Sequence, residues 1–109
     1  MVKPVSFLGS SLEDLRCLPL EVRRTAGFQL HKIQEGGHPD DWKPMSTVGR
    51  GVMECRIRDA TGAYRLLYVA SFPEAVYVLH VFRKATARTS SQDLVLGQRR
   101  FRDLMRYRA

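Results

Sequence analysis

The stretch "VMECRIRDATGAYRLLYVASFPEAVYVLHVFRK", residues 52–84, decides the fold. Its first part, residues 52–59, alternates apolar and polar side chains with a period of two, which is typical of a strand with one solvated face. A turn at "ATG" follows, and a second turn at "FPE" separates two further apolar segments, residues 63–72 and 75–84. Because Gly and Pro punctuate the segments at these points, the stretch predicts three consecutive antiparallel strands, a β-meander.

The segments before the meander predict a strand and a short helix. "PVSFLG" predicts a first short strand near the N-terminus. "SSLEDLRCL" follows it and predicts a helix with a capping box. In this box Ser10 or Ser11 is the N-cap, and Glu13 or Asp14 bonds back to free backbone N–H groups.

A second helix is predicted over "PLEVRRTAGFQLHKIQEGG", residues 19–37. Pro19 suits its first turn, and Gly36 and Gly37 end it. Its apolar side chains keep helical spacing: they are Leu20, Val22, Ala26, Leu30 and Ile33. Residues 38–51 contain many turn-forming residues and predict a loop or a short strand.

The last segment, residues 90–107, predicts an amphipathic helix with four arginines available to solvent. The side chains expected to face the protein are Leu94, Phe101, Leu104 and Met105. We therefore expect one domain over residues 1–109 with an α+β fold: a small curved antiparallel sheet with the helices packed mainly on one face.

The chain is strongly basic for its size. Its 109 residues carry 18 Lys and Arg against 11 Asp and Glu, a net charge of +7. Such a surplus attracts phosphate-rich polymers or anionic surfaces. The sequence shows no signal peptide and no membrane span, so a cytoplasmic protein is expected. Cys17 and Cys55 lack metal-ligand spacing, and we interpret both as reduced thiols in the core, with no metal or cofactor.

The meander allows the strand register to be predicted. If the first turn closes at Gly62, Arg56 lies opposite Arg65 and Arg58 lies opposite residue 63. Across the second turn, Arg65 then lies near residues 80–82 and residue 63 lies near Lys84. Five cations therefore gather toward one end of the sheet: Arg56, Arg58, Arg65, Arg83 and Lys84.

Two interpretations of this cluster stay open. Like charges opposite one another destabilise a sheet by up to about 1 kcal/mol per pair. A polyanion would supply the missing negative charge, and Arg suits bidentate contacts to phosphate. Alternatively, the cations are solvated strand ends, and Glu54 neutralises Arg56 or Arg65.

Two other residues also have two interpretations each. His80 is either a satisfied core histidine or a catalytic base. Trp42, beside Lys43, could stack on a nucleic-acid base or cover the end of the core.

The ordered set "LHKIQEGGHPDDWKPM", "GVMECRIRDATGAYRLLYVA" and "AVYVLHVFRKAT" resembles the phage-derived branch of the RelE/HigB toxin superfamily. The resemblance covers nearly the whole chain and implies a RelE-like fold. It also implies a ribosome-dependent mRNA endoribonuclease that uses no metal and is held inactive by a cognate antitoxin, often one with a helix-turn-helix DNA-binding domain. In this family the ribose 2′-OH attacks the adjacent phosphate, which requires stabilisation of charge and a route for protons.

The resemblance assigns roles residue by residue. The residues that it implies for cleavage are Arg65, Arg83 or Lys84, with His80 as a substitute proton-transfer group. Those that we expect to bind RNA are Arg56, Arg58, Lys43 and Trp42. We place Arg65 at the centre of the phosphate site. Because its side chain is expected to be solvated, Arg65→Ala is expected to leave the fold nearly intact.

One departure from the family pattern concerns proton transfer. Some members carry a tyrosine or histidine shortly after the last strand, and "ATARTSSQD" contains neither. The alternatives are proton transfer by His80, by a substrate group or by a ribosomal group, and a reaction that relies on Arg and Lys alone. Two alternatives to RNA cleavage follow: a toxin that inhibits DNA gyrase, as the ParE-like sister branch does, or a non-catalytic basic RNA-binding phage accessory module.

Overall fold

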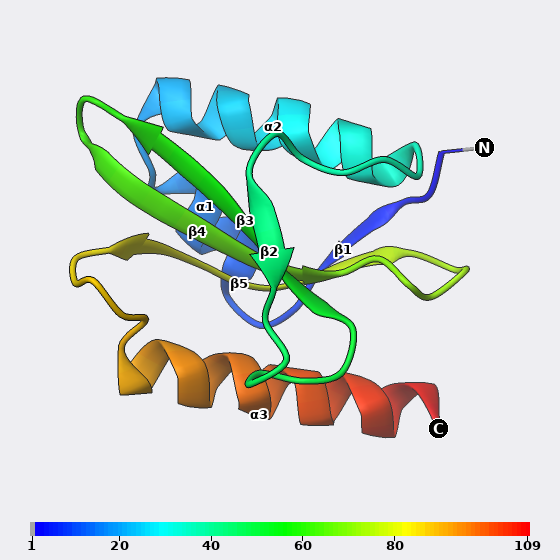
Figure 1. The fold of residues 1–109 in the computed structure, drawn as a ribbon. Helices are drawn as coiled ribbons and strands as arrows, with labels where there is room; N and C mark the ends of the chain where they lie inside the picture. Colours follow the sequence, from blue (N-terminus) through cyan, green and yellow to red (C-terminus); the bar gives the residue numbers. More distant parts are fainter. Residues whose placement is uncertain (1) are drawn as a thin grey trace.

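The three central strands form the predicted meander in a computed structural model that describes residues 2–109. They belong to a five-stranded sheet of order β1-β5-β4-β3-β2 that is accompanied by three helices (Figure 1). The elements are β1 (Val5–Phe7), α1 (Ser11–Arg16), α2 (Leu20–Gln34), β2 (Trp42–Pro44), β3 (Val52–Asp59), β4 (Gly62–Val69), β5 (Val76–Lys84) and α3 (Ser91–Arg108). The α+β class and the meander are confirmed.

The predicted register is also confirmed. Arg56 pairs with Arg65 across β3 and β4, and Arg58 pairs with Ala63. Across β4 and β5, Arg65 pairs with Phe82, and Ala63 pairs with Lys84. The two-residue turn between Asp59 and Gly62 fixes the pairs of β3 with β4. The pairs of β4 with β5 depend on the second turn and also on a shift of register between Leu67 and Tyr68.

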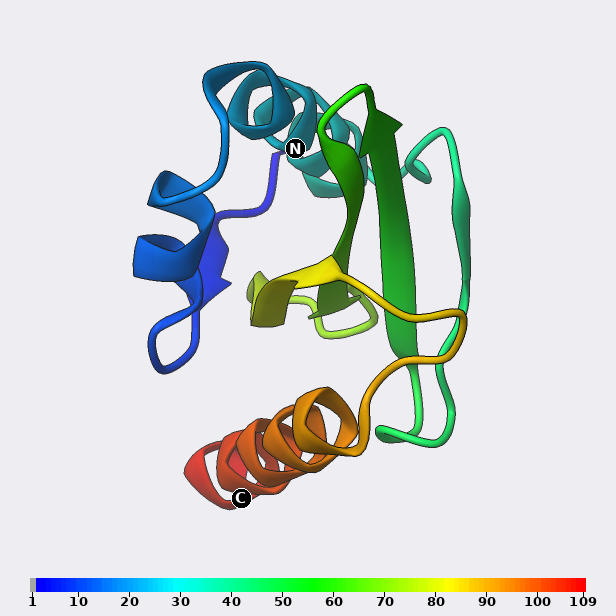
Figure 2. The same ribbon diagram turned by 90° about the vertical axis from the view of Figure 1, so that its left-hand side faces the viewer.

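Helices cover both faces of the sheet. Val22, Ala26, Leu30 and Ile33 of α2 pack on the face formed by Cys55, Ile57, Tyr64 and Leu66. Leu104 of α3 packs on the opposite face with Leu67, Val69 and Leu79. Figures 1 and 2 show α2 and α3 on opposite sides of the strands. The N-terminal helices pack on one face as predicted, with Leu15 of α1 against the same core cluster as α2. The C-terminal helix α3 covers the other face, because β4 and β5 are apolar on both sides and each side needs a cover.

The first strand joins the sheet in a way that the meander does not predict. β1 pairs with β5 in parallel, with Val5 opposite Val76 and Phe7 opposite Val78. It therefore adds one parallel edge to an otherwise antiparallel sheet.

The N-terminal helices depart from prediction in three details. The capping box does not form: Ser10 is the N-cap of α1, but its hydroxyl donates to Asp14 Oδ2 at 2.8 Å and accepts no backbone N–H. Leu20, at the start of α2, is exposed. Cys17 is also exposed, whereas Cys55 is a free thiol in the core as expected.

Helix α3 begins with a true cap, since the Ser90 hydroxyl accepts the backbone N–H of Asp93 at 3.1 Å. One of its arginines does not point to solvent as predicted. Arg100 reaches across to β5 and donates through Nη1 to the Leu79 carbonyl oxygen at 2.9 Å. No helix within residues 2–109 is long and apolar enough to cross a membrane.

Candidate functional site

A β-bulge in β5 determines on which face of the sheet the side chains at the end of this strand lie. The register shifts between Leu67 and Tyr68, so that Leu67 pairs with His80 while Tyr68 pairs with Val78. Leu79 is the extra residue, and the alternation of faces is inverted beyond it. As a result, Lys84 shares a face with Arg65, whereas Arg83 shares the opposite face with its partner Tyr64.

Four strands bring cations to one face at one end of the sheet. We call this set the cation cluster: Lys43 of β2, Arg56 and Arg58 of β3, Arg65 of β4 and Lys84 of β5. α3 packs on the same face of the sheet, but the β3–β4 hairpin projects away from α3 and beside α2 (Figure 1). The outer cations of the cluster therefore face solvent; Arg58, for example, is exposed.

Glu54 lies at the base of the cation cluster, and its side chain is 0% exposed. Its Oε1 atom accepts a hydrogen bond from Arg56 Nε at 3.0 Å and lies 3.5 Å from Arg65 Nε. Lys43 Nζ is 4.0 Å from the same oxygen. The predicted solvated face of β3 is thus wrong at Glu54. The suggestion that Glu54 neutralises Arg56 or Arg65 is confirmed, since it contacts both.

The two inner cations of the cluster are partly desolvated. Arg65 is 8% exposed, and its Nη1 donates to its neighbour's carbonyl, that of Tyr64, at 3.0 Å. Burial lowers the pKa of the Arg65 guanidinium, and the ion pair with Glu54 opposes this shift. Burial also lowers the pKa of the Lys84 ammonium, with further lowering from the positive charge of Arg65. Of these two inner cations, Lys84 loses its proton more readily, because an ammonium group is less basic than a guanidinium group.

Arg83 is not part of the cluster. Its side chain is exposed on the α2 face, and its Nη2 donates to the Thr61 carbonyl at 2.9 Å. The expectation that Arg83 joins the other cations is corrected by the bulge, because a single extra residue exchanges the faces of Arg83 and Lys84.

His80 is buried under the start of α3. Its Nε2 atom lies 2.7 Å from Asp93 Oδ1, and its ring stacks on Phe82 with centroids 4.6 Å apart. The sequence did not indicate Asp93 as its partner, because thirteen residues and a loop separate the two. This environment favours the interpretation of a core histidine over that of a base in contact with substrate.

Trp42 lies on the other face of β2 from Lys43. It pairs with Cys55 and stacks on His38, with centroids 4.1 Å apart and planes at 5°. The structure therefore brings Lys43 into the cluster and leaves Trp42 outside it.

The cluster has the chemistry of a phosphate site. Its guanidinium and ammonium donors come from four strands, and the buried carboxylate of Glu54 neutralises only part of their charge. Guanidinium groups bind phosphate oxygens through paired N–H donors. One more acid lies at its rim: Asp41 Oδ1 is 4.0 Å from Arg56 Nη1. The surplus of positive charge fits a polyanion of extended shape.

Comparisons with known proteins agree with this fold. A family model described as "Phage derived protein Gp49-like (DUF891)" matches residues 13–102. Among solved structures, the chain is similar to the E. coli toxin RelE in the free state, in a double arginine-to-alanine mutant. The TM-score is 0.65 at 23% identity, and the match covers 87% of this chain and 96% of that one. No curated protein matches the chain.

Proposed function

Because the chain belongs to the phage-derived Gp49-like family, a RelE-like family, we propose that it is the toxin of a toxin–antitoxin pair and cleaves messenger RNA on the ribosome. The resemblance read from the sequence is confirmed at the level of this family. The narrower HigB assignment stays a prediction.

The observation that carries the proposal is the cation cluster. Arg56 and Arg65 face each other on neighbouring strands, with Lys43 and Lys84 on either side. A sheet selected for stability alone would not place like charges in opposed positions. An RNA backbone supplies the negative charge that this surface lacks.

In the proposed reaction the ribose 2′-oxygen attacks the adjacent phosphorus. The bond between phosphorus and the 5′-oxygen breaks, which leaves a 2′,3′-cyclic phosphate on one product and a 5′-hydroxyl on the other. Negative charge grows on the phosphoryl oxygens in the transition state. Arg56 and Arg65 stabilise it, a contribution of about 3–4 kcal/mol for each preorganised donor.

Two protons move in this reaction. The 2′-OH loses one, and the leaving 5′-oxygen gains one. Lys84 is our candidate for the group that accepts the first, since burial and nearby cations lower its pKa and make the neutral amine more accessible. The proposal gives His80 no direct contact with substrate, because its ring is buried against Phe82 and Asp93.

The proposed partner is a cognate antitoxin. A protein with clustered cations and a net charge of +7 would otherwise bind RNA indiscriminately. An acidic antitoxin segment that folds on the cation cluster would mask it, as coupled folding and charge complementarity allow. We expect this partner to carry a helix-turn-helix domain and to be encoded next to the toxin.

Primer extension on mRNA from cells that express the chain tests the proposal. Discrete new 5′ ends within translated messages, absent when translation is blocked, are the expected result. Intact mRNA together with inhibition of supercoiling by purified gyrase would favour the ParE-like alternative instead. Absence of both effects would leave the non-catalytic RNA-binding alternative.

A further inference from the structure

The buried carboxylate of Glu54 is the feature that the proposed reaction has not used. It lies under the cation cluster with no exposed surface, and its Oε2 atom has no hydrogen-bond partner within residues 2–109. Burial of a charge is costly, and a buried oxygen without a partner adds to that cost. A carboxylate kept under these conditions calls for an explanation beyond stability.

Glu54 contacts the two arginines at their inner nitrogens. Its Oε1 atom accepts a hydrogen bond from Arg56 Nε at 3.0 Å and forms an ion pair, without a hydrogen bond, with Arg65 Nε at 3.5 Å. Nε is the guanidinium nitrogen nearest the backbone, and each guanidinium carries five N–H donors in a planar fork. Arg65 uses one further donor, on Nη1, for the Tyr64 carbonyl. Within residues 2–109, contact at the inner nitrogens leaves Nη2 of Arg65 and both Nη atoms of Arg56 without a hydrogen bond to the protein.

We propose that Glu54 is a positioning residue that holds Arg56 and Arg65 by their inner nitrogens and turns their outer nitrogens toward the scissile phosphate. The inference rests on the function proposed above and names a residue that the resemblance does not assign. It also explains how two opposed arginines can remain ordered before RNA binds: a shared counter-ion offsets their repulsion.

Such a role predicts opposite effects on binding and turnover. The negative charge of Glu54 weakens the attraction of the cluster for any polyanion, so its loss should tighten RNA binding. The same loss frees the two guanidiniums from their fixed orientation, and misplacement of a catalytic group by about 1 Å can cost about 10²-fold in rate. A merely structural carboxylate would, when removed, weaken binding and turnover together.

The test uses Glu54→Gln, which keeps the shape and removes the charge. Binding is measured on a short single-stranded DNA, which lacks the 2′-OH and is not cleaved. We expect tighter binding, with the slope of log K against log salt steeper by about 0.7, the value for one more charge on a single strand. On translating ribosomes with a reporter mRNA, we expect kcat to fall about 10²-fold.

Asp41→Asn is the matched control. Asp41 is exposed, and its Oδ1 is 4.0 Å from Arg56 Nη1, so this change also removes one negative charge beside the same arginine. It should steepen the salt dependence similarly and lower kcat far less than Glu54→Gln does. The proposal is overturned if Glu54→Gln turns over like the parent, or if its binding and turnover fall in parallel.

A measurement on the unsubstituted protein keeps the inference independent of cleavage and of whether the variant folds. Nitrogen-15 NMR should show slowly exchanging Nε–H signals for Arg56 and Arg65. Rapid exchange of both would contradict the positioning role. If the parent cleaves no RNA but shows these protected signals, the proposed function fails while the ordered cluster stands.

Discussion

Arg56 and Arg65 lie directly opposite one another on β3 and β4, and one oxygen of a buried carboxylate contacts the Nε atom of each. The pair is therefore a preorganised double guanidinium, in which two like charges are held close before any ligand arrives. Preorganised donors of this kind lose little entropy when a phosphate binds them.

Arg65→Ala should abolish mRNA cleavage, because loss of one preorganised donor at the phosphoryl group costs about 3–4 kcal/mol of transition-state stabilisation. It should also lower the stability of the fold by about 1–3 kcal/mol, since Glu54 loses one of its buried partners. The sequence had suggested a solvated Arg65 and a nearly intact fold, and burial corrects that expectation. Ribosome-dependent cleavage of a reporter, measured beside thermal melting, checks both effects.

The control for Arg65→Ala is Arg99→Ala on the exposed side of α3. Its stability should change by no more than about 0.5 kcal/mol, and cleavage should continue. Full activity in Arg65→Ala would show that the cluster is structural.

Lys84→Ala and Arg83→Ala form a matched pair on adjacent residues that face opposite sides of the sheet. We expect Lys84→Ala to eliminate cleavage and Arg83→Ala to retain most of it, because only Lys84 shares a face with Arg65. Cleavage of the same reporter at equal protein concentration measures the difference. The opposite ranking would mean that the β5 bulge does not select the catalytic cation.

The pH dependence of kcat should report Lys84. Burial and neighbouring cations lower its pKa, and only the neutral amine accepts a proton, so kcat should rise with pH and level off above that pKa. Lys84→Arg keeps the charge but does not titrate in this range, so its kcat should be low and lack this rise. An unchanged pH profile in Lys84→Arg would exclude Lys84 as the proton acceptor.

Glu74 should contribute stability that is lost in acid. Its hydrogen bond with Arg108 lowers the pKa of the Glu74 carboxyl to about 2. Because the folded pKa lies below the ordinary value of 4.5, the contribution is fully present above that value and disappears as pH falls toward 2. The Tm difference between the parent and Glu74→Gln should therefore shrink over this range. A constant difference would show that the pair does not couple to folding.

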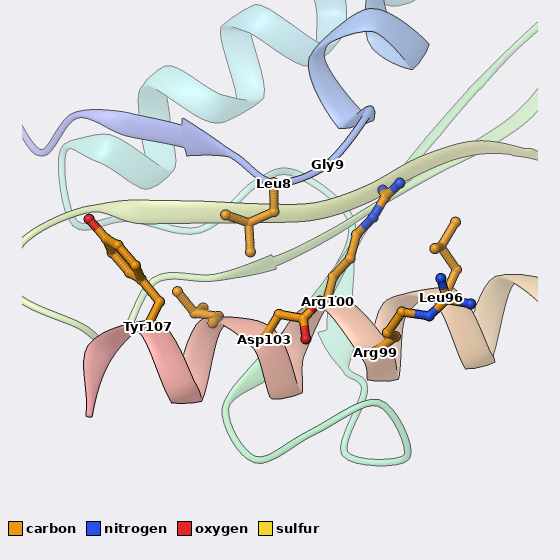
Figure 3. A pocket seen from close by; sticks show the side chains of 8 residues that line it. Leu8, Gly9, Leu96, Arg99, Arg100, Asp103 and Tyr107 are labelled. Atoms are coloured by element: carbon orange, nitrogen blue, oxygen red, sulfur yellow. The ribbon is translucent and has the colours of Figure 1, made fainter.

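The Arg100 side chain connects α3 to β5 and to Ser10 at the start of α1, and it lies close to Gly9. It lines a hollow of about 360 Å³ between α3 and the β1–α1 connection (Figure 3), and its Nη2 donates to Ser10 Oγ at 2.9 Å. Gly9 has φ +55°, and a Cβ there would lie 2.6 Å from Arg100 Nε. Gly9→Ala should thus destabilise the fold by more than the ~1–2 kcal/mol of its backbone conformation alone.

A double-mutant cycle separates these two costs. In an Arg100→Ala background, Gly9→Ala should cost only the backbone part, so the two changes should be non-additive. Chemical denaturation of the four proteins gives the required free energies of unfolding. Additivity within about 0.5 kcal/mol would contradict the steric contact.

The sequence predicted the strands and their register well because both depend on local signals. The turn before Gly62 sets the pairing of Arg56 with Arg65, and the turn around Pro73 brings Arg65 near residues 80–82, so short-range spacing suffices to find both. The bulge at Leu79 has no such signal, since an extra apolar residue in an apolar run leaves the composition unchanged. The assignment between Arg83 and Lys84 therefore stayed open until the structure placed each on its face.

The burial of Glu54 was equally hard to predict. Its position in an alternating strand indicates a solvated side chain. Only the pairing of β3 with β2 and β4, which brings Lys43 and Arg65 beside Glu54, removes it from water. The partner of His80 was missed for a similar reason, because Asp93 reaches it through the packing of α3 on the sheet. Tertiary contacts, unlike turns, leave little trace in a single sequence.

The parallel pairing of β1 with β5 has a consequence for synthesis of the chain. β1 cannot pair until β5 has been synthesised, because Val5 lies opposite Val76. The cation cluster likewise requires residues from Lys43 to Lys84. Pairings so distant along the chain form late, since loop closure precedes the contacts that stabilise them. A nascent chain therefore lacks an assembled cation cluster until β5 has emerged from the ribosome, when most of the protein has already been made.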